Sequence, residues 1–156
     1  MTTRGRFILI EGTDGSGKAT QAKLLARVLR KQGRQVMTVD FPQHGKPSAW
    51  FVDEYLNGKF GMAKSLGSKV PSLFYALDRF EAAPRICTAL KAGKTIIANR
   101  YTLSNAAHQG GKITSAKERQ KYWQWLFDLE YNLLQLPKPN VTIILHVSPK
   151  VSQQLV

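Results

Sequence analysis

The sequence predicts an α/β fold in which a mainly parallel sheet is flanked by helices in three layers. Two observations predict it: short apolar runs alternate with stretches of helical periodicity, and loops rich in glycine or proline separate them. The chain has 156 residues, 43% of them hydrophobic, which is enough for one domain with its own core. We therefore expect residues 1–156 to form a single domain.

Four runs have the composition of strands that are buried on both faces. They are Phe7–Ile10, Val36–Asp40, Thr95–Ala98 and Val141–Val147. A helical stretch separates each run from the next, so the pattern is βαβαβαβ. Crossover connections of this kind join parallel strands.

Helical periodicity fills the intervals between these strands. The first helix ends at Gly33, a residue type that suits a helix C-cap. A short helix is expected around Trp50–Leu56. The next helix starts at Pro71, is bent or split at Pro84, and ends near Gly93.

The last predicted helix has a clear start and a clear end. Ser115 and Glu118 have the spacing of a capping box. Apolar residues then recur at intervals of four and three: Tyr122, Leu126, Leu129, Leu133 and Leu136. Because Pro137 cannot continue a helix, one long helix is expected to end there.

Charge and cysteine content restrict the class of protein. The formal charge of +13 favours polyanionic partners, which include nucleic acids, membrane surfaces and phosphorylated small molecules. Cys87 is the only cysteine and cannot form an internal disulfide. The early apolar run Phe7–Ile10 is too short for a signal or a membrane span. We expect a cytoplasmic protein without a membrane partner.

A phosphate-binding loop lies directly between the first strand and the first helix. Its residues are Gly12, Thr13, Asp14, Gly15, Ser16, Gly17 and Lys18. Glycines let successive backbone N–H groups surround an anion, and Lys18 can reach the outer phosphates. The next residue, which is usually Ser or Thr and binds Mg²⁺, is Ala19, and Thr20 is turned about 100° away from it on the helix. We assign ATP phosphates to 12–20 and no side chain as a metal ligand.

The sequence resembles the thymidylate kinase family, which phosphorylates dTMP with ATP and Mg²⁺. Glu11–Gln21 is similar to that family's phosphate loop, with an acidic residue in the middle. Further similar segments follow in the family's order: Phe41-Pro42, Phe74 with Arg79, Arg100–Ala106 and Leu136–Pro139. The resemblance implies a P-loop NTPase fold, conversion of dTMP to dTDP in dTTP biosynthesis, and a homodimer.

The resemblance also implies roles for individual residues. It assigns Lys18, Arg100 and Asp14 to catalysis. The residues assigned to dTMP are Asp14, Phe41, Pro42, Phe74, Arg79, Arg100, Ser104, Asn105 and His108. In this scheme Phe74 stacks on thymine, Arg79 donates to its O4 and Asn105 pairs with its edge.

The chain departs from the family at several positions. An acid usually precedes the Arg-Tyr pair, but Asn99 stands here. An arginine usually follows Phe-Pro, whereas this chain has Gln43 and His44, so His44 or Lys46 could serve instead. The family continues after the fourth strand into an arginine-rich lid and a fifth strand. We therefore expect residues 1–156 alone to be poor in phosphoryl transfer and to expose a sheet edge.

Two alternatives differ from this interpretation. One is a P-loop kinase for another nucleotide or for a nucleoside. The other is a non-catalytic nucleotide- or nucleic-acid-binding module, although we consider nucleic acid an unlikely partner. A steep salt dependence of oligonucleotide binding would favour the module, because it reports released counterions.

Overall fold

The computed structural model describes residues 5–61, 65–148 and 152. These residues group into two compact units. Unit 1 contains the described residues of Met1–Asp40, Arg85–Tyr101 and Lys138–Val156, and unit 2 those of Phe41–Pro84 and Thr102–Pro137. That residues 1–156 form a single domain stays a prediction.

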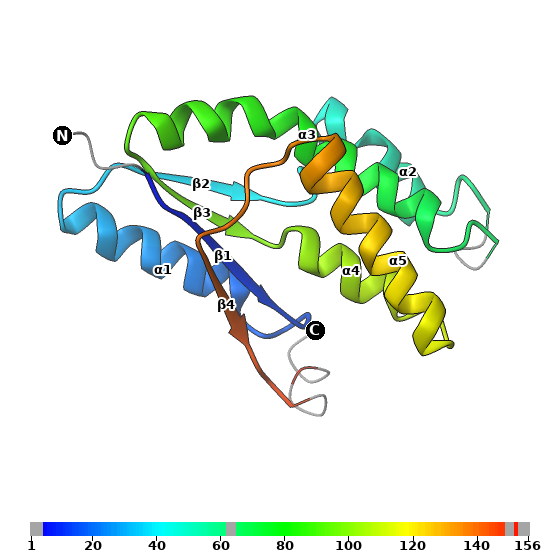
Figure 1. The fold of residues 1–156 in the computed structure, drawn as a ribbon. Helices are drawn as coiled ribbons and strands as arrows, with labels where there is room; N and C mark the ends of the chain where they lie inside the picture. The colour runs from blue at the N-terminus through cyan, green and yellow to red at the C-terminus, as the bar shows by residue number, and fades with distance from the viewer. Residues whose placement is uncertain (1–4, 62–64, 149–151, 153–156) are drawn as a thin grey trace. The chain divides into compact units, whose positions relative to one another are not determined.

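Unit 1 contains a four-stranded parallel sheet, which confirms the predicted fold class. Its strands are β1 (Phe7–Gly12), β2 (Val36–Asp40), β3 (Thr95–Asn99) and β4 (Val141–Leu145). Their spatial order is β2-β3-β1-β4 (Figure 1). Because β1 and β3 are parallel neighbours, their carboxyl ends lie side by side, and the segments that follow them leave the sheet at the same end.

Helix α1 (Lys18–Lys31) covers one face of this sheet (Figure 1). Its Ala22 and Ala26 form a buried cluster with Ile10 of β1 and Ile97 of β3. Alanines on this side of the helix let its backbone approach the strands closely. This packing fixes the start of α1 relative to the end of β1, where the phosphate loop lies.

The fourth strand differs from its prediction. β4 lies at one edge of the sheet and pairs with β1 alone among the described strands. Its Val141, Ile143 and Ile144 are 44%, 39% and 65% exposed. The expectation of a strand buried on both faces is therefore wrong for β4. An apolar run does not show how many neighbouring strands will pair with it. Among the described strands β4 is an edge strand, and its second side has no strand partner there.

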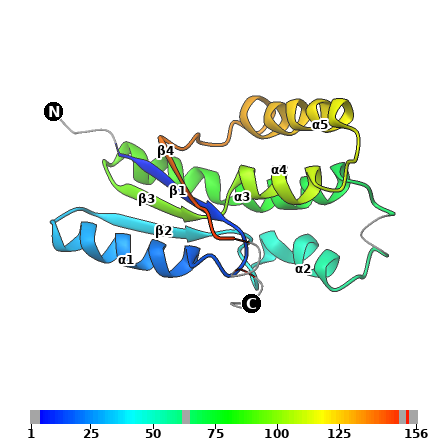
Figure 2. The ribbon, with the colours of Figure 1, turned by 90° about the horizontal axis from the view of Figure 1, so that it is seen from below.

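Unit 2 is helical. It contains η1 (Pro47–Ala49), α2 (Trp50–Leu56), the larger part of α3 (Lys69–Lys91), α4 (Thr102–Gly110), α5 (Ala116–Asp128) and a π-helical turn, η2 (Leu129–Leu133). Helices α4 and α5 lie side by side (Figure 2). Ala106, Tyr122 and Leu126 are the buried residues of the cluster between them.

Helix α3 runs through Pro84 without a break. The predicted split is therefore wrong. Ile86 and Ala82 are fully buried on either side of the proline, so packing can offset the hydrogen bond that proline removes. Within residues 5–61, 65–148 and 152, no helix is both long enough and apolar enough to cross a membrane.

The two helix ends predicted at glycines are confirmed. Gly33 and Gly93 have φ angles of 78° and 79°, which glycine adopts without a steric penalty. The N–H of Gly33 donates to the Arg30 carbonyl at 3.0 Å, and that of Gly93 to the Leu90 carbonyl at 3.1 Å. Each glycine satisfies a carbonyl of the last helical turn.

The last predicted helix is divided into two kinds of helix. Ser115 caps α5 as expected, because its side chain accepts from the Glu118 N–H. After Asp128 the chain widens into the π-helical turn Leu129–Leu133. This turn changes which residues face inward, and its Glu130 is fully buried.

Candidate functional site

The loop between β1 and α1 has the backbone that an anion-binding loop requires. Gly12, Gly15 and Gly17 have φ angles of 154°, 73° and 83°. A Cβ atom at Gly12 would lie 2.7 Å from the Leu145 carbonyl oxygen and 2.6 Å from the Ser16 Oγ atom, so no side chain fits there. The loop then enters the N-terminus of α1, whose N–H groups and partial positive charge favour phosphate.

The side chain of Lys18 folds back over this loop. It is 6% exposed, and its Nζ donates to the Thr13 carbonyl at 2.6 Å and lies 3.7 Å from Asp14 Oδ1. Burial lowers the pKa of Lys18, whereas the carboxylates of Glu11 and Asp40 oppose that shift. The ammonium group is therefore held beside the loop, where it could exchange the Thr13 carbonyl for a phosphate oxygen.

Ser16 supplies a second polar group to the loop. Its Oγ atom is buried and has no hydrogen-bond partner among the described residues. Leaving a buried hydroxyl unsatisfied costs about 1–3 kcal/mol, which an incoming phosphate oxygen would remove. Ala19 and Thr20 are exposed on the first turn of α1.

Arg100 lies beside the same loop, at the end of β3. Its guanidinium pairs with the carboxylate of Asp14 through Nη2 and Oδ1. Its backbone has a φ of 63°, which is rare for a residue with a side chain. The Arg100 N–H donates to the Ile10 carbonyl at 3.0 Å, and the next N–H, of Tyr101, donates to Glu11 Oε1 at 2.9 Å. These bonds from β1 hold the strained turn that aims Arg100 at the loop.

Burial lowers the pKa of Arg100, and the carboxylate of Glu11 opposes this shift. An arginine keeps its charge under such a shift, because its ordinary pKa is far above neutrality. Asp14 thus lies between two cations, Lys18 and Arg100, at the end of two neighbouring strands. The arrangement can hold two anionic groups close together.

The residues beside the loop fit a magnesium ion that arrives with a nucleotide. No cluster of three or more His, Cys, Asp or Glu side chains occurs in the described ranges, so a protein cage is absent there. Asn99 Nδ2 donates to Asp40 Oδ1 at 2.7 Å, and Asn99 Oδ1 is buried and accepts no bond from the described residues. Mg²⁺ keeps several waters and binds mainly to substrate phosphates. Asp40 Oδ1 and Asn99 Oδ1 could accept hydrogen bonds from those waters.

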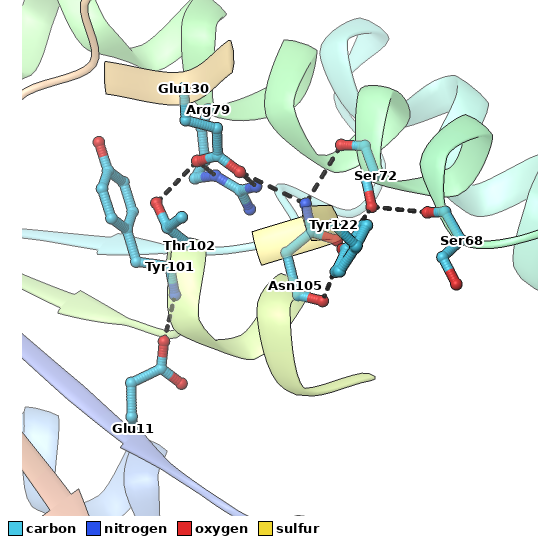
Figure 3. Close-up of polar contacts among 9 residues, drawn as sticks. All are labelled: Glu11, Ser68, Ser72, Arg79, Tyr101, Thr102, Asn105, Tyr122 and Glu130. Atoms are coloured by element: carbon cyan, nitrogen blue, oxygen red, sulfur yellow. Dashed lines mark hydrogen bonds and ion pairs between the residues drawn. The ribbon is translucent and has the colours of Figure 1, made fainter. Parts of the chain in front are cut away.

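In unit 2 a buried carboxylate gathers polar side chains from two helices (Figure 3). Glu130 of the π-helical turn is fully buried. It accepts from Arg79 of α3 twice, from Nε at 2.8 Å and from Nη2 at 2.5 Å, and from Thr102 Oγ1 of α4 at 2.7 Å. The guanidinium of Arg79 is thus held by a bidentate ion pair.

Asn105 of α4 belongs to the same network. It is 4% exposed, and its Nδ2 donates to the Ser72 carbonyl at 3.2 Å and to Glu130 Oε1 at 3.4 Å. Its Oδ1 atom is buried and has no partner among the described residues. The Ser72 hydroxyl contacts the Tyr122 hydroxyl at 2.7 Å (Figure 3). The sequence predicts Asn105 at this site, but not the side chains that hold it.

Phe74 lies in an aromatic cluster. Its ring centroid is 5.3 Å from that of Phe51, 5.5 Å from Phe60 and 6.3 Å from Tyr55. On an α-helix, residues five apart are turned about 140° from each other, so Phe74 and Arg79 do not share a face. Residues four apart are turned by only about 40°, and Tyr75 has that spacing.

Tyr75 is the aromatic residue on the Arg79 side of α3. Burial raises the pKa of Tyr75 to about 12, and the positive charge of Arg79 acts in the opposite direction. Tyr75 is half-buried, and its spacing of four from Arg79 places the two side chains on one face of α3. This placement favours Tyr75 over Phe74 as the ring beside Arg79.

The segment that follows β2 belongs to unit 2. Phe41 is buried, and its peptide bond to Pro42 is cis. The Gln43 N–H donates to Asp78 Oδ2 at 2.8 Å. His44 is exposed, and its Nδ1 lies 2.5 Å from Asp53 Oδ1.

This hydrogen bond from His44 is the main reason that the pKa of Asp53 is lowered. Lys46, the other candidate for the missing arginine, donates from Nζ to Gln43 Oε1 at 2.7 Å. Ser104 and His108 both lie on α4, where Ser104 is half-buried and His108 is exposed.

The chain matches a family model over most of its length. The model is described as thymidylate kinase, and it covers residues 10–155. This chain belongs to the thymidylate kinase family. Thymidylate kinases are nucleoside monophosphate kinases, which agrees with a loop that suits phosphates.

Individual thymidylate kinases are similar over nearly the whole chain. A thymidylate kinase of Mycobacterium tuberculosis H37Rv is 34% identical over 147 residues, which are 94% of this chain and 68% of that protein. One of Afipia carboxidovorans is 37% identical over 92% of this chain and 60% of its own length. The solved thymidylate kinase of Candida albicans has a TM-score of 0.79 and 28% identity, covering 99% of this chain and 68% of that one. The chain thus spans roughly two thirds of these relatives.

The sequence does not predict individual roles for Glu130, Tyr75 and Glu11. Glu130 lies in a stretch of helical periodicity, and the one available signal is an acid directly after the apolar Leu129, since a buried charge needs a partner. Tyr75 precedes Arg79 by four residues, and this spacing places both on one helix face. Glu11, which orders the backbone at Tyr101, carried no signal beyond its place at the end of β1.

Proposed function

We propose that this chain carries the donor-phosphate and acceptor residues of a thymidylate kinase, which transfers the γ-phosphoryl group of ATP to dTMP and releases ADP and dTDP. The observation that carries this proposal is the placement of Lys18 and Arg100 on either side of Asp14, next to the phosphate loop. Two cations beside one anion-binding loop suit the meeting of two phosphorylated substrates.

The proposed mechanism depends on positioning and charge. The loop N–H groups and Lys18 hold the donor phosphates, while Arg100 aligns the phosphate of dTMP, whose oxygen attacks the γ-phosphorus as ADP leaves. Asp14 accepts a hydrogen bond from the sugar 3′-hydroxyl. A bound Mg²⁺ ion would neutralise charge on the ATP phosphates, with Asp40 and Asn99 receiving bonds from its waters.

We assign the recognition of thymine to unit 2. Arg79, held by Glu130, donates to O4, and Asn105 faces the ring edge. For the stacking ring we favour Tyr75, because it shares the Arg79 face of α3. Phe74 stays a prediction, and its three ring neighbours support a packing role instead.

We also propose that the chain forms a homodimer through α3. Val70, Leu73, Leu77 and Phe80 are 39%, 38%, 47% and 48% exposed and recur at intervals of three and four. Exposed apolar residues at this spacing form one stripe along a helix, which is typical of helix–helix interfaces. A cytoplasmic location is the setting in which ATP and dTMP would both be available.

The experiment for this proposal measures ADP release from ATP, Mg²⁺ and dTMP. We expect residues 1–156 alone to turn over slowly, because the loop has no arginine between Gly12 and Gly17, and loss of such a group costs about 10³ to 10⁵ in rate. The sequence that follows Val156 in its source DNA, if it continues in frame, would be added to a second protein. Equal rates of ADP release by the two proteins would show that the sequence after Val156 does not supply a catalytic arginine.

A further inference from the structure

The amide of Asn105 has only its oxygen atom left for a further hydrogen bond within the described residues. Both contacts of Nδ2 are made inside unit 2, to the Ser72 carbonyl and to Glu130 Oε1. The residue is 4% exposed, and Oδ1 is left without a partner among the described residues. Because both N–H groups of this amide already donate, the group that remains, the oxygen atom, can only accept a hydrogen bond.

Glu130 determines this polarity. If the amide were flipped, Asn105 Oδ1 would face two oxygen acceptors, the Ser72 carbonyl and the Glu130 carboxylate. Two buried acceptors in contact repel each other and lack a proton to share, so the flipped amide is disfavoured. The Ser72 carbonyl is part of the backbone, and Glu130 is the partner that carries a full negative charge.

The same carboxylate fixes the second polar group of the site. Both oxygens of Glu130 accept from Arg79, so the guanidinium is held in one plane. The π-helical turn Leu129–Leu133 brings the carboxylate to this position, and the hydroxyl of Thr102 accounts for a further lone pair. One buried acid therefore orients a donor, Arg79, and an acceptor, Asn105 (Figure 3).

We propose that Glu130 is a positioning residue that makes the site select a pyrimidine with a protonated N3 over one without. The inference rests on the proposed function, because it assumes that Arg79 and Asn105 face the base. Thymine offers an N3–H donor to Asn105 Oδ1 and an O4 acceptor to Arg79. Cytosine offers a bare N3 to the same oxygen and an amino group to the same guanidinium, so both contacts fail.

The test compares the affinities of dTMP and dCMP by calorimetric titration of residues 1–156. We expect wild type to bind dTMP at least about 100-fold more tightly than dCMP. Each of the two mismatched hydrogen bonds should lower the affinity for dCMP by about tenfold. Glu130→Gln adds an amide donor beside Asn105 and should narrow that ratio by about tenfold or more. Since it also leaves Arg79 without its counter-charge, Glu130→Asp is measured alongside. It keeps the charge but withdraws the carboxylate by one methylene.

Ser72→Ala is the matched control. It removes hydroxyl contacts to Ser68 and Tyr122 in the same network but keeps the carbonyl that accepts from Asn105. It should therefore lower the melting temperature without changing the ratio of dTMP to dCMP affinity. If Glu130 had a purely structural role, its variants would likewise have a lower melting temperature and an unchanged ratio of dTMP to dCMP affinity.

Two results would overturn the inference, and they are distinguishable. If wild type prefers dTMP and a folded Glu130 variant keeps the wild-type ratio, Glu130 does not set the polarity of the site, and the proposed function stands. If wild type shows no preference for dTMP over dCMP, the assignment of the base pocket fails with it.

Discussion

Replacing Tyr75 should weaken dTMP binding, whereas replacing its neighbour Phe74 should not. Tyr75 lies about 40° around α3 from Arg79, and Phe74 about 140°. This spacing of four places Tyr75 on the Arg79 side of the helix, where burial raises the pKa of Tyr75 to about 12 and the charge of Arg79 opposes that shift. Stacking of a base on an aromatic ring contributes about 1–3 kcal/mol, so Tyr75→Ala should weaken dTMP binding by about 5- to 150-fold.

Phe74→Ala should instead lower stability. Its ring is half-buried and packs on Phe51 and Phe60 with centroids 5.3 Å and 5.5 Å away. Truncating a fully buried phenylalanine costs about 3–5 kcal/mol, and we expect about half of that here. Urea unfolding gives the stability of each variant, and calorimetry gives its dTMP affinity. A Phe74→Ala protein that is as stable as wild type but binds dTMP poorly would refute this reasoning.

Three further predictions concern the loop, the buried ion pair and α3. Lys18→Ala should weaken ATP binding in calorimetric titration while the circular dichroism spectrum stays unchanged, and undiminished ATP affinity would exclude the loop as a donor site. Arg79→Leu should destabilise the chain by about 3–5 kcal/mol in urea, because it leaves the carboxylate of Glu130 buried and unpaired, whereas the double variant with Glu130→Leu should recover much of that loss. An Arg79→Leu variant with the urea midpoint of wild type would show that the Arg79–Glu130 ion pair does not stabilise the chain. Leu77→Glu should convert a dimer to a monomer in sedimentation analysis, and a dimer that persists would show that the α3 stripe is not the interface.

The phosphate loop could be predicted from sequence because all its determinants are local. Glycines, lysine and the strand-to-helix context follow one another between Gly12 and Lys18, and the backbone angles there agree with the motif. The position of Arg100 follows in the same way, since parallel pairing brings the ends of β1 and β3 to one edge. Such features need only the order of the elements.

The rest of the site depends on distant contacts. Glu130 reaches Arg79 only because the chain changes from an α-helix to a π-helical turn after Asp128, and periodicity predicts an unbroken helix there. The choice between Phe74 and Tyr75 depends on which ring other aromatics already surround. The exposure of β4 depends on what pairs with the strand, and an apolar run does not show that.

Calorimetric titration of residues 1–156 with dTMP and with dGMP tests the central claim most directly. Binding does not require phosphoryl transfer, so this measurement is independent of the turnover of the chain. We expect dTMP to bind at least about tenfold more tightly than dGMP, because a purine mismatches the polar groups of Arg79 and Asn105. Binding of dGMP that is as tight as that of dTMP would contradict it.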